Sequence, residues 1–282
     1  MWAFRWLVLV ILCQVSEVLA HAPEVPGQAQ SNEILTTLQH AVDRDAGFAT
    51  LQPLIQYLLD TRQTALLQPY LSMLPDYAES TSEQAILLLL QGRAALVAQD
   101  LCAAQSKLFE LQALESNGQN IAPRLSLLTH IMAFQQSKAV TAASLTCMLE
   151  QSRSVSIARG LKRSQSVFLD IKFATESHKL SQSGMAQVQN LLAALKGMDL
   201  STLQLNLIGH ADTRGSDAYN LALSERRANS IKSLLLSAGA FSELQIVSRG
   251  AGEREPLIKG DSPEALALNR RVELFFKILE PN

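Results

Sequence analysis

The chain has 282 residues, a formal net charge of −2 and 48% hydrophobic residues. This length is sufficient for one large domain or two ordinary domains. The nearly balanced charge, without a basic stripe interleaved with aromatic residues, excludes a typical nucleic-acid-binding protein. The sequence has no CxxC motif and no cluster of cysteine and histidine, so we expect neither a metal site nor a cofactor.

Residues 1–20 have the features of a secretory signal peptide. A short positive region precedes an apolar run at 6–13, which is too short to span a bilayer. The small residue Ala20 marks the cleavage position, so we expect His21 to begin the mature chain, with an uncleaved anchor as the alternative. Cys13 lacks the small residue that precedes a lipidated cysteine. No later segment is long and apolar enough to span a membrane, and we expect no transmembrane segment after cleavage.

Residues 21–31 are rich in Pro, Gly, Gln and Ser and are predicted to form a flexible lead. Residues 32–151 are predicted to be all-α, because their apolar residues recur at spacings of three and four. The clearest helices are expected at 82–99, 101–115, 121–137 and 140–151. The small residues Gly92 and Ala95 resemble the close crossing positions of tetratricopeptide hairpins, so we predict a TPR-like helical-hairpin domain, with an irregular bundle as the alternative. Such hairpins typically present a groove to a partner protein.

The two remaining cysteines, Cys102 and Cys147, both lie in predicted helices. An even number of cysteines in an oxidising compartment permits a disulfide, and two buried free thiols are the alternative. Residues 152–165 are polar and basic. We predict a solvated linker there, with a charged contact to an anionic partner as the alternative.

Residues 166–282 change to a pattern of alternating strands and helices that predicts a βαβαββ order. Leu203, Leu205 and Leu207 show the period of two that is typical of a half-buried strand. The strands are expected at 166–173, 203–211, 244–249 and 271–279, and the helices at 184–196 and 219–238. A short helix is expected at 262–268, with Ser262 as its N-cap and Pro263 at its first position. In open α/β layers, the strand ends and the following helix N-terminus form the crevice where ligands bind.

Five sequence blocks in this region occur in the order of a known family. They are Gly209-His-Ala-Asp212, Gly215-Ser-Asp-Ala-Tyr-Asn220, Leu223-Ser-Glu-Arg-Arg-Ala228, Gly250-Ala-Gly-Glu-Arg-Glu-Pro256 and Asn269-Arg-Arg-Val-Glu273. About residues 164–279 thus resemble the OmpA-like C-terminal domain, a family that includes the periplasmic domains of OmpA, Pal and MotB. The resemblance implies an α/β sandwich that binds peptidoglycan non-covalently, through the diaminopimelate of its stem peptide.

The resemblance also implies which residues bind the zwitterionic end of diaminopimelate. Asp212 would accept hydrogen bonds from the ammonium, and Arg227 would hold the carboxylate with its planar fork. The other implied contacts are Asn220, Leu223, Arg270 and, at the periphery, Thr175. Because Arg270 and Arg271 alternate, only one is expected to face the crevice, and we choose Arg270.

The sequence departs from the family pattern at two positions. Ala211 replaces the usual Thr, and Leu266 replaces an Arg that often precedes the Asn-Arg-Arg block. Neither change affects the pair of Asp212 and Arg227. His210 lies near serines, but no nucleophile elbow is present, so we predict no catalytic residue.

We therefore expect a non-catalytic protein of the Gram-negative periplasm, associated with the cell wall and the outer membrane. Residues 166–282 would bind peptidoglycan, and residues 32–151 would bind a partner protein that the sequence does not identify. One alternative is a secreted cell-envelope enzyme that uses the OmpA-like domain for wall targeting. A motor stator component is disfavoured, because it needs a membrane-spanning helix with an acidic residue.

Overall fold

A computed structural model describes residues 28–114, 121–138, 140–158, 166–174, 177–239, 241–242 and 245–279. The expected signal peptide at 1–20, Thr175 and half of the predicted linker, residues 159–165, lie outside the described residues. The chain divides into two compact units, Met1–Tyr77 and Ala78–Asn282, which we describe separately. Among the described residues, no helix is long and apolar enough to cross a membrane.

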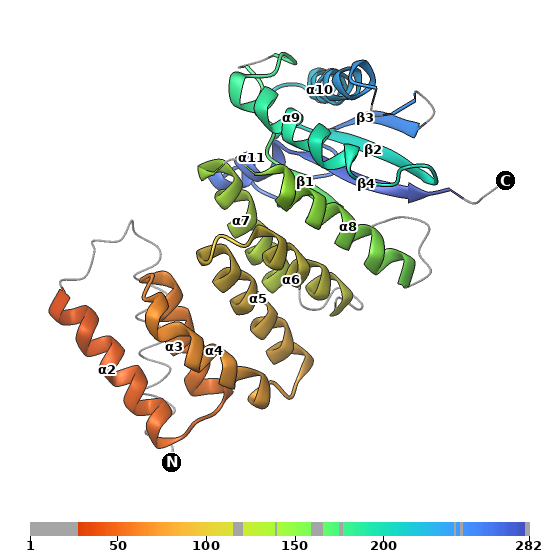
Figure 1. The fold of residues 1–282 in the computed structure, drawn as a ribbon. Coiled ribbons are helices and arrows are strands. Elements are labelled where there is room, and N and C mark those ends of the chain that lie inside the picture. Colours follow the sequence, from red (N-terminus) through yellow and green to blue (C-terminus); the bar gives the residue numbers. More distant parts are fainter. Residues whose placement is uncertain are drawn as a thin grey trace. The chain divides into compact units, whose positions relative to one another are not determined.

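The first unit is helical, as predicted. It contains α2 (Gln28–Arg44), α3 (Phe48–Asp60), α4 (Thr64–Met73) and the 3₁₀ helix η1 (Leu74–Tyr77) (Figure 1). Helix α3 is the centre of this unit, because Leu51, Leu54, Ile55 and Leu58 are all fully buried. Their spacing of three and four places them on one helix face. Helix α2 begins inside the predicted flexible lead at 21–31, so the structure makes the last residues of that lead helical.

The second unit begins with the helices α5 (Thr81–Val97), α6 (Leu101–Leu114), α7 (Ile121–Ser137) and α8 (Ala142–Ala158). Ser80 starts α5 with a capping box, in which its hydroxyl accepts from the Glu83 N–H and the Glu83 carboxylate accepts from the Ser80 N–H. A Cβ atom at Gly92 would lie 2.6 Å from the side chain of Leu127, so this glycine lets α5 approach α7 closely. Helix α8 continues beyond the predicted end at Gln151, so residues 152–158 are helical rather than part of a linker.

A disulfide joins α6 to α8. The bridge links Cys102 and Cys147, whose Cα atoms lie 5.9 Å apart, and it resolves the alternative that the sequence left open. The two cysteines are 45 residues apart in the chain. In the chain-entropy model, closing a loop of this length stabilises the folded state by about 4 kcal/mol.

A four-stranded sheet follows, and its order of elements agrees with the predicted βαβαββ pattern. The strands are β1 (Val167–Leu169), β2 (Leu203–His210), β3 (Ile246–Gly252) and β4 (Val272–Ile278), arranged in the order β1-β4-β2-β3. β2 runs parallel to β3, and β4 runs antiparallel to both β1 and β2. β1 is shorter than the predicted 166–173. Beyond it, the strand pairing that the described residues show is an isolated bridge between Phe173 and Leu180.

Three helices accompany the sheet: α9 (Gln182–Lys196), α10 (Asp217–Ser237) and α11 (Pro263–Asn269). Helix α10 packs on β2 and β3, and α9 lies between α10 and α8 (Figure 1). Helix α11 begins as predicted, with the Ser262 hydroxyl accepting from the Ala265 N–H and Pro263 at the first position.

Helices α5 to α8 share one hydrophobic core with the sheet. Gln135 of α7 makes the most direct connection. Its side-chain amide donates to the Phe168 carbonyl and accepts from the Asp170 N–H, both at 3.1 Å. These two bonds satisfy the open edge of β1, as a neighbouring strand would. The structure thus places these helices and the sheet in one compact unit, whereas the sequence analysis assigned them to separate domains. The predicted domain boundaries and the TPR-like character of the helices stay predictions.

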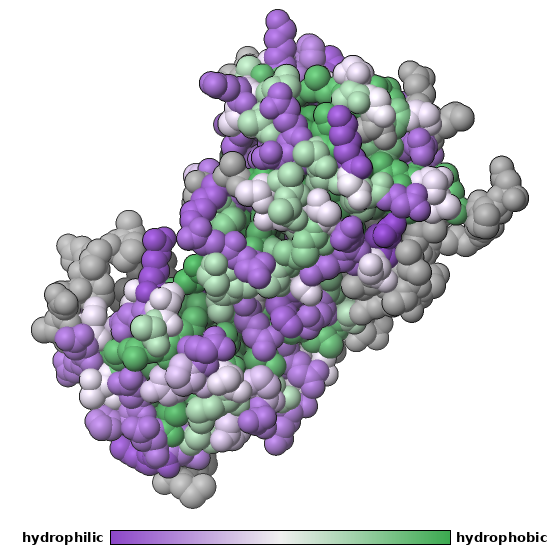
Figure 2. All heavy atoms as spheres, in the orientation of Figure 1, coloured by the Kyte–Doolittle hydropathy of each residue, from purple (hydrophilic) through white to green (hydrophobic). Residues whose placement is uncertain are grey.

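The surface in Figure 2 mixes hydrophilic and hydrophobic residues. The large hydrophobic side chains that are exposed come from different elements: Ile34, Leu66, Met185, Tyr219 and Val247. Isolated apolar residues of this kind are normal on soluble surfaces and do not mark a docking face.

Candidate ligand-binding site

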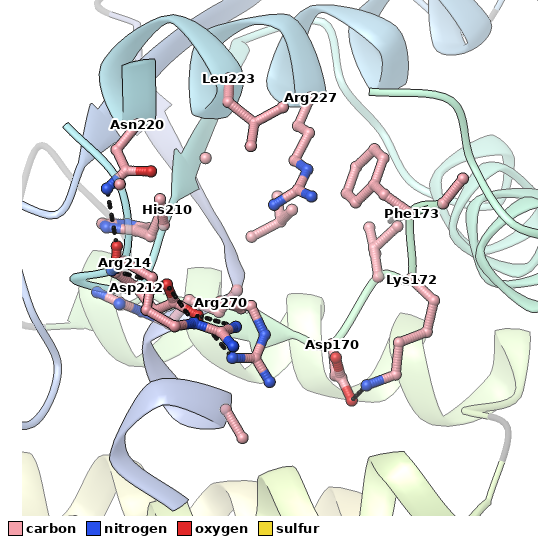
Figure 3. A pocket seen from close by; sticks show the side chains of 18 of the residues that line it. Asp170, Lys172, Phe173, His210, Asp212, Arg214, Asn220, Leu223, Arg227 and Arg270 are labelled. Atoms are coloured by element: carbon pink, nitrogen blue, oxygen red, sulfur yellow. Dashed lines mark hydrogen bonds and ion pairs between the residues drawn. The ribbon is translucent and has the colours of Figure 1, made fainter. Parts of the chain in front are cut away.

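A pocket of about 690 Å³ opens where β2 ends and α10 begins. Its walls also include α11, the start of β4 and the segment that follows β1 (Figure 3). The charged side chains that line it are Asp170, Lys172, Asp212, Arg214, Arg227, Arg270 and Arg271. The pocket lies at the strand ends, where the predicted α/β order expects a ligand.

The close approach of α10 to the sheet determines the shape of this pocket. Gly209 of β2 and Gly250 of β3 lie opposite each other in the sheet. A Cβ atom at Gly209 would lie 2.2 Å from the Ser224 carbonyl, and one at Gly250 would lie 2.6 Å from the Glu225 nitrogen. The Ser224 hydroxyl also accepts from the Gly252 N–H at 2.9 Å. Only glycine permits α10 to pack this closely on the two strands.

Asp212 lies two residues beyond β2, and its side chain is only 7% exposed. Arg214 Nη2 and Arg270 Nη1 each donate to its Oδ2 at 2.7 Å. Burial alone would raise the pKa of this carboxyl, but the hydrogen bonds from the two arginines outweigh burial and lower the pKa to about 2. Asp212 is therefore a carboxylate at neutral pH.

Arg227 projects from α10 toward the pocket (Figure 3). Its Nε donates to the Ser177 carbonyl at 3.0 Å, and its guanidinium lies 5.0 Å from the centre of the Phe173 ring. The side chain is half-buried, and this burial lowers its pKa. Within the described parts of the chain, Arg227 forms no ion pair with a carboxylate. The partners that the structure describes for this arginine are neutral, so they leave its charge available for an anion.

Asn220 and Leu223 come from the first two turns of α10. The Asn220 side-chain amide donates to the Asp212 carbonyl at 3.0 Å and to Glu253 Oε2 at 2.6 Å. Ser216 is the N-cap of α10, because its hydroxyl accepts from the Tyr219 N–H, so Asn220 has no capping role. Asn220 instead fixes the loop that carries Asp212. Leu223 is buried and supplies an apolar wall.

The two arginines of the Asn-Arg-Arg block have different partners. Asn269 accepts from the N–H groups of Leu257 and Ile258, which fixes the loop before α11. Arg270 then points to Asp212. Arg271 is buried, where its Nη2 donates to the Glu255 carbonyl at 3.2 Å, and burial lowers its pKa to about 10.

His210 does not form a catalytic arrangement with Ser224. The ring is 2% exposed, and its Nε2 lies 3.3 Å from Glu273 Oε2. Burial lowers the pKa of His210, so the ring is neutral at pH 7. The Ser224 hydroxyl donates to the Leu221 carbonyl, so it is not positioned as a nucleophile for His210. Among the described residues, no cluster could hold a metal ion.

We predict that the folded protein loses stability in acid, because the buried carboxylate of Glu273 must then take up a proton. Burial raises its pKa, but the contact with His210 and the hydrogen bond from Ser166 lower the pKa to about 2, below the 4.5 of an unperturbed glutamate. A depressed folded pKa stabilises the fold above pH 4.5, and this contribution disappears as the pH falls toward 2. We expect wild type to lose on the order of 3 kcal/mol from this group in that range. Urea unfolding between pH 6 and pH 2 measures it. In Glu273→Gln, the free energy of unfolding should fall less steeply between pH 6 and pH 2 than in wild type. If it falls just as steeply, the low pKa of Glu273 is not the source of the acid sensitivity.

The structure brings together five of the six predicted site residues: Asp212, Asn220, Leu223, Arg227 and Arg270. Thr175 lies outside the described residues. Sequence reasoning missed Arg214, although its position two residues after Asp212 in a polar loop was a usable signal. It also missed the ion pair of Lys172 Nζ with Asp170 Oδ2, at 2.7 Å, on the opposite wall of the pocket.

The fold and pocket define a small α/β domain whose site contains the carboxylate of Asp212 and the guanidinium of Arg227, for which the described residues supply no carboxylate partner. Comparison with known families agrees with this description. Residues 172–270 match the OmpA family, so this part of the chain is an OmpA family domain.

Known proteins match a part of this chain of similar length. Outer membrane porin F of Pseudomonas aeruginosa is 35% identical over 107 residues, which are 38% of this chain and 30% of that protein. Outer membrane protein A of Bordetella avium is 33% identical over 105 residues, which are 37% of this chain and 53% of that protein. The chain therefore spans about half or less of the length of these relatives. Among solved structures, the peptidoglycan-associated lipoprotein of Burkholderia pseudomallei is 26% identical, with a TM-score of 0.34, over 40% of this chain and 90% of that one.

Proposed function

We propose that this protein is a non-catalytic cell-wall anchor that binds peptidoglycan through the diaminopimelate of its stem peptide. Its place is the Gram-negative periplasm, next to the outer membrane. The OmpA family domain at 172–270 supplies the binding site, and the helical region links the wall to a partner protein.

The observation that carries this proposal is the guanidinium of Arg227, which forms no ion pair with a carboxylate among the residues that the structure describes. A half-buried arginine without an anionic partner costs stability unless a ligand supplies the anion. Ser177 and Phe173 hold its side chain in position, so a planar carboxylate can meet the fork without a large loss of entropy.

A second group of the ligand is specified by Asp212. Its carboxylate lies on the wall opposite the aromatic ring of Phe173, in the same pocket as Arg227 (Figure 3). A ligand with a carboxylate and an ammonium on one carbon can contact both charged groups at once. The free end of diaminopimelate has this structure, and the apolar Leu223 can contact its methylene chain.

The volume of the pocket supports a peptide rather than a single small ion. At about 690 Å³ it exceeds what one amino-acid end requires, and it lies within the range of typical ligand pockets. The additional space leads past Asp170 and Lys172, where the remainder of a stem peptide can lie.

The helical region supports the second half of the proposal less directly. None of the described residues of helices α2 to α8 lines the pocket, so their exposed surface is not needed for the binding site. Helical hairpins commonly use such surfaces to hold other proteins. The chemistry of this partner is not specified by the described residues.

The proposal is tested by comparing two kinds of cell wall. The full chain without residues 1–20 is sedimented with sacculi of the diaminopimelate type and with sacculi of the lysine type. Lysine retains the ammonium but lacks the neighbouring carboxylate, so it leaves Arg227 unpaired. We expect the protein to pellet with diaminopimelate-type sacculi and to remain mostly soluble with the lysine type and without sacculi. Equal pelleting with both walls would show that the carboxylate is not recognised, and no pelleting with either would refute wall binding.

A further inference from the structure

The carboxylate of Asp212 is already saturated by protein groups. Its Oδ1 accepts from the Arg214 backbone N–H at 3.1 Å and from Arg214 Nε at 3.2 Å. Its Oδ2 accepts from Arg214 Nε at 3.1 Å, from Arg214 Nη2 at 2.7 Å and from Arg270 Nη1 at 2.7 Å. A carboxylate offers about four lone-pair sites. An incoming ammonium therefore finds no free acceptor on Asp212.

Arg214 holds the part of the carboxylate that a ligand would need. Its side chain spans both oxygens, whereas Arg270 reaches only Oδ2 with one nitrogen. Figure 3 shows the two arginines gathered around Asp212 on the same side of the pocket. An ammonium that approaches either oxygen must open the contact with Arg214.

Of the two arginines that contact Asp212, Arg214 can move away from the carboxylate at the lower cost in free energy. Its side chain is 67% exposed, compared with 40% for Arg270. In the described part of the chain, Asp212 is its only side-chain partner. Arg270 follows α11 directly and is held there by its backbone N–H, which donates to the Leu266 carbonyl. An exposed arginine on a polar loop regains full hydration when it swings away, so the exchange requires no rearrangement of the fold.

We propose that Arg214 is an internal counter-ion that competes with the ligand for Asp212, and that the cationic group of the ligand binds by displacing it. This inference rests on the proposed function, because it takes Asp212 as the ammonium site. The exchange of one cation for another returns little free energy by itself. Binding therefore depends on the second contact, between the ligand carboxylate and Arg227. In this way Arg214 lowers the affinity for every cationic ligand by the same factor, so that a simple amine, which lacks the second contact with Arg227, binds only weakly.

The test removes the competing charge. Arg214→Gln retains a hydrogen-bonding side chain of similar reach but cannot pair as a cation. Arg254→Gln is the matched control, because Arg254 is 57% exposed and pairs through two nitrogens with Asp217, outside the pocket lining. Two probes are titrated into the full chain without residues 1–20 and followed by NMR. One probe is a soluble stem peptide that contains diaminopimelate. The other is 1,5-diaminopentane, which has the same amine spacing without carboxylates.

We expect Arg214→Gln to bind both probes more tightly than wild type, by about two- to fivefold. The factor should be the same for both probes, because each must displace the same guanidinium. Arg254→Gln should match wild type. Weaker binding by Arg214→Gln would show that Arg214 contacts the ligand, and unchanged binding would show that it does not compete; either result overturns the inference. If Arg214→Gln bound only the stem peptide more tightly, the inference would also be overturned. Arg214 would then act on the ligand carboxylate, which 1,5-diaminopentane lacks.

Asp212→Asn separates this inference from the proposed function. If Asp212 is the ammonium site, this variant loses most of its affinity for both probes, whatever Arg214→Gln does. If Asp212→Asn binds like wild type, the proposed site itself is wrong. The effects of the two arginine variants are interpreted only alongside circular dichroism spectra that match wild type, which their exposed positions lead us to expect.

Discussion

Arg227→Ala is expected to lose binding to diaminopimelate-type sacculi almost completely. Removing one partner of a half-buried charge pair costs about 2–5 kcal/mol, which corresponds to a loss of roughly 30-fold to several thousand-fold in affinity. The loss is large because the ligand carboxylate would then be desolvated without a cation. Isothermal titration with a soluble stem peptide measures the affinity, and co-sedimentation shows the same effect on whole sacculi.

Arg226→Ala is the control for this experiment. Arg226 is the preceding residue on the same helix, has the same charge and is exposed to solvent. Its replacement should leave binding unchanged. Arg227→Lys should remain defective, because an ammonium cannot reproduce the planar fork or its stacking on Phe173. If Arg226→Ala and Arg227→Ala weaken binding equally, the effect is one of general charge, and the assigned site is wrong.

Gly209→Ala is expected to damage both the fold and the site. The added Cβ would lie 2.2 Å from the Ser224 carbonyl, which belongs to the backbone and cannot rotate away. Helix α10 must then move off the sheet, and it carries Leu223 and Arg227 with it. We expect the free energy of unfolding to fall by about 3 kcal/mol or more. Affinity for the stem peptide should fall in the protein that remains folded.

Gly197→Ala provides a matched change at the end of α9. Gly197 has a φ of −84°, and a Cβ atom there would lie 3.6 Å from its nearest neighbour, the Ala194 carbonyl. This variant should unfold in urea at nearly the wild-type concentration. Should Gly209→Ala be equally stable, the close packing of α10 on β2 would not be essential, and the position of Arg227 would need another explanation.

Local sequence patterns were sufficient to predict most strands and helices of the C-terminal region. The alternation of Leu203, Leu205 and Leu207 predicted β2, and the structure buries all three side chains. Ser262 and Pro263 predicted the start of α11 for a reason that is also local, since a cap and a first-turn proline act within one turn. The first strand was predicted too long, because alternation continues to Phe173 while pairing with β4 stops at Leu169.

The candidate site was partly predictable for the same reason. Asp212 ends a strand, and Arg227 lies on the helix that follows it, so a short stretch of chain brings both to one pocket. Arg214 escaped prediction although it is close in sequence. Whether its side chain turns to Asp212 or to solvent depends on the conformation of the loop, and residue types alone do not specify that conformation.

The sequence by itself determined the helical and α/β parts of the chain, because periodicity, caps and short spacings act over a few turns or one strand–helix unit. Its resemblance to a known family supplied the identity of five residues of one pocket. Tertiary structure decided the contacts between distant segments. Examples are the disulfide of Cys102 with Cys147, the two bonds of Gln135 to β1, and the approach of Arg270 to Asp212. Each joins residues that are more than 30 positions apart, and their proximity follows from the packing of a shared core rather than from any local preference.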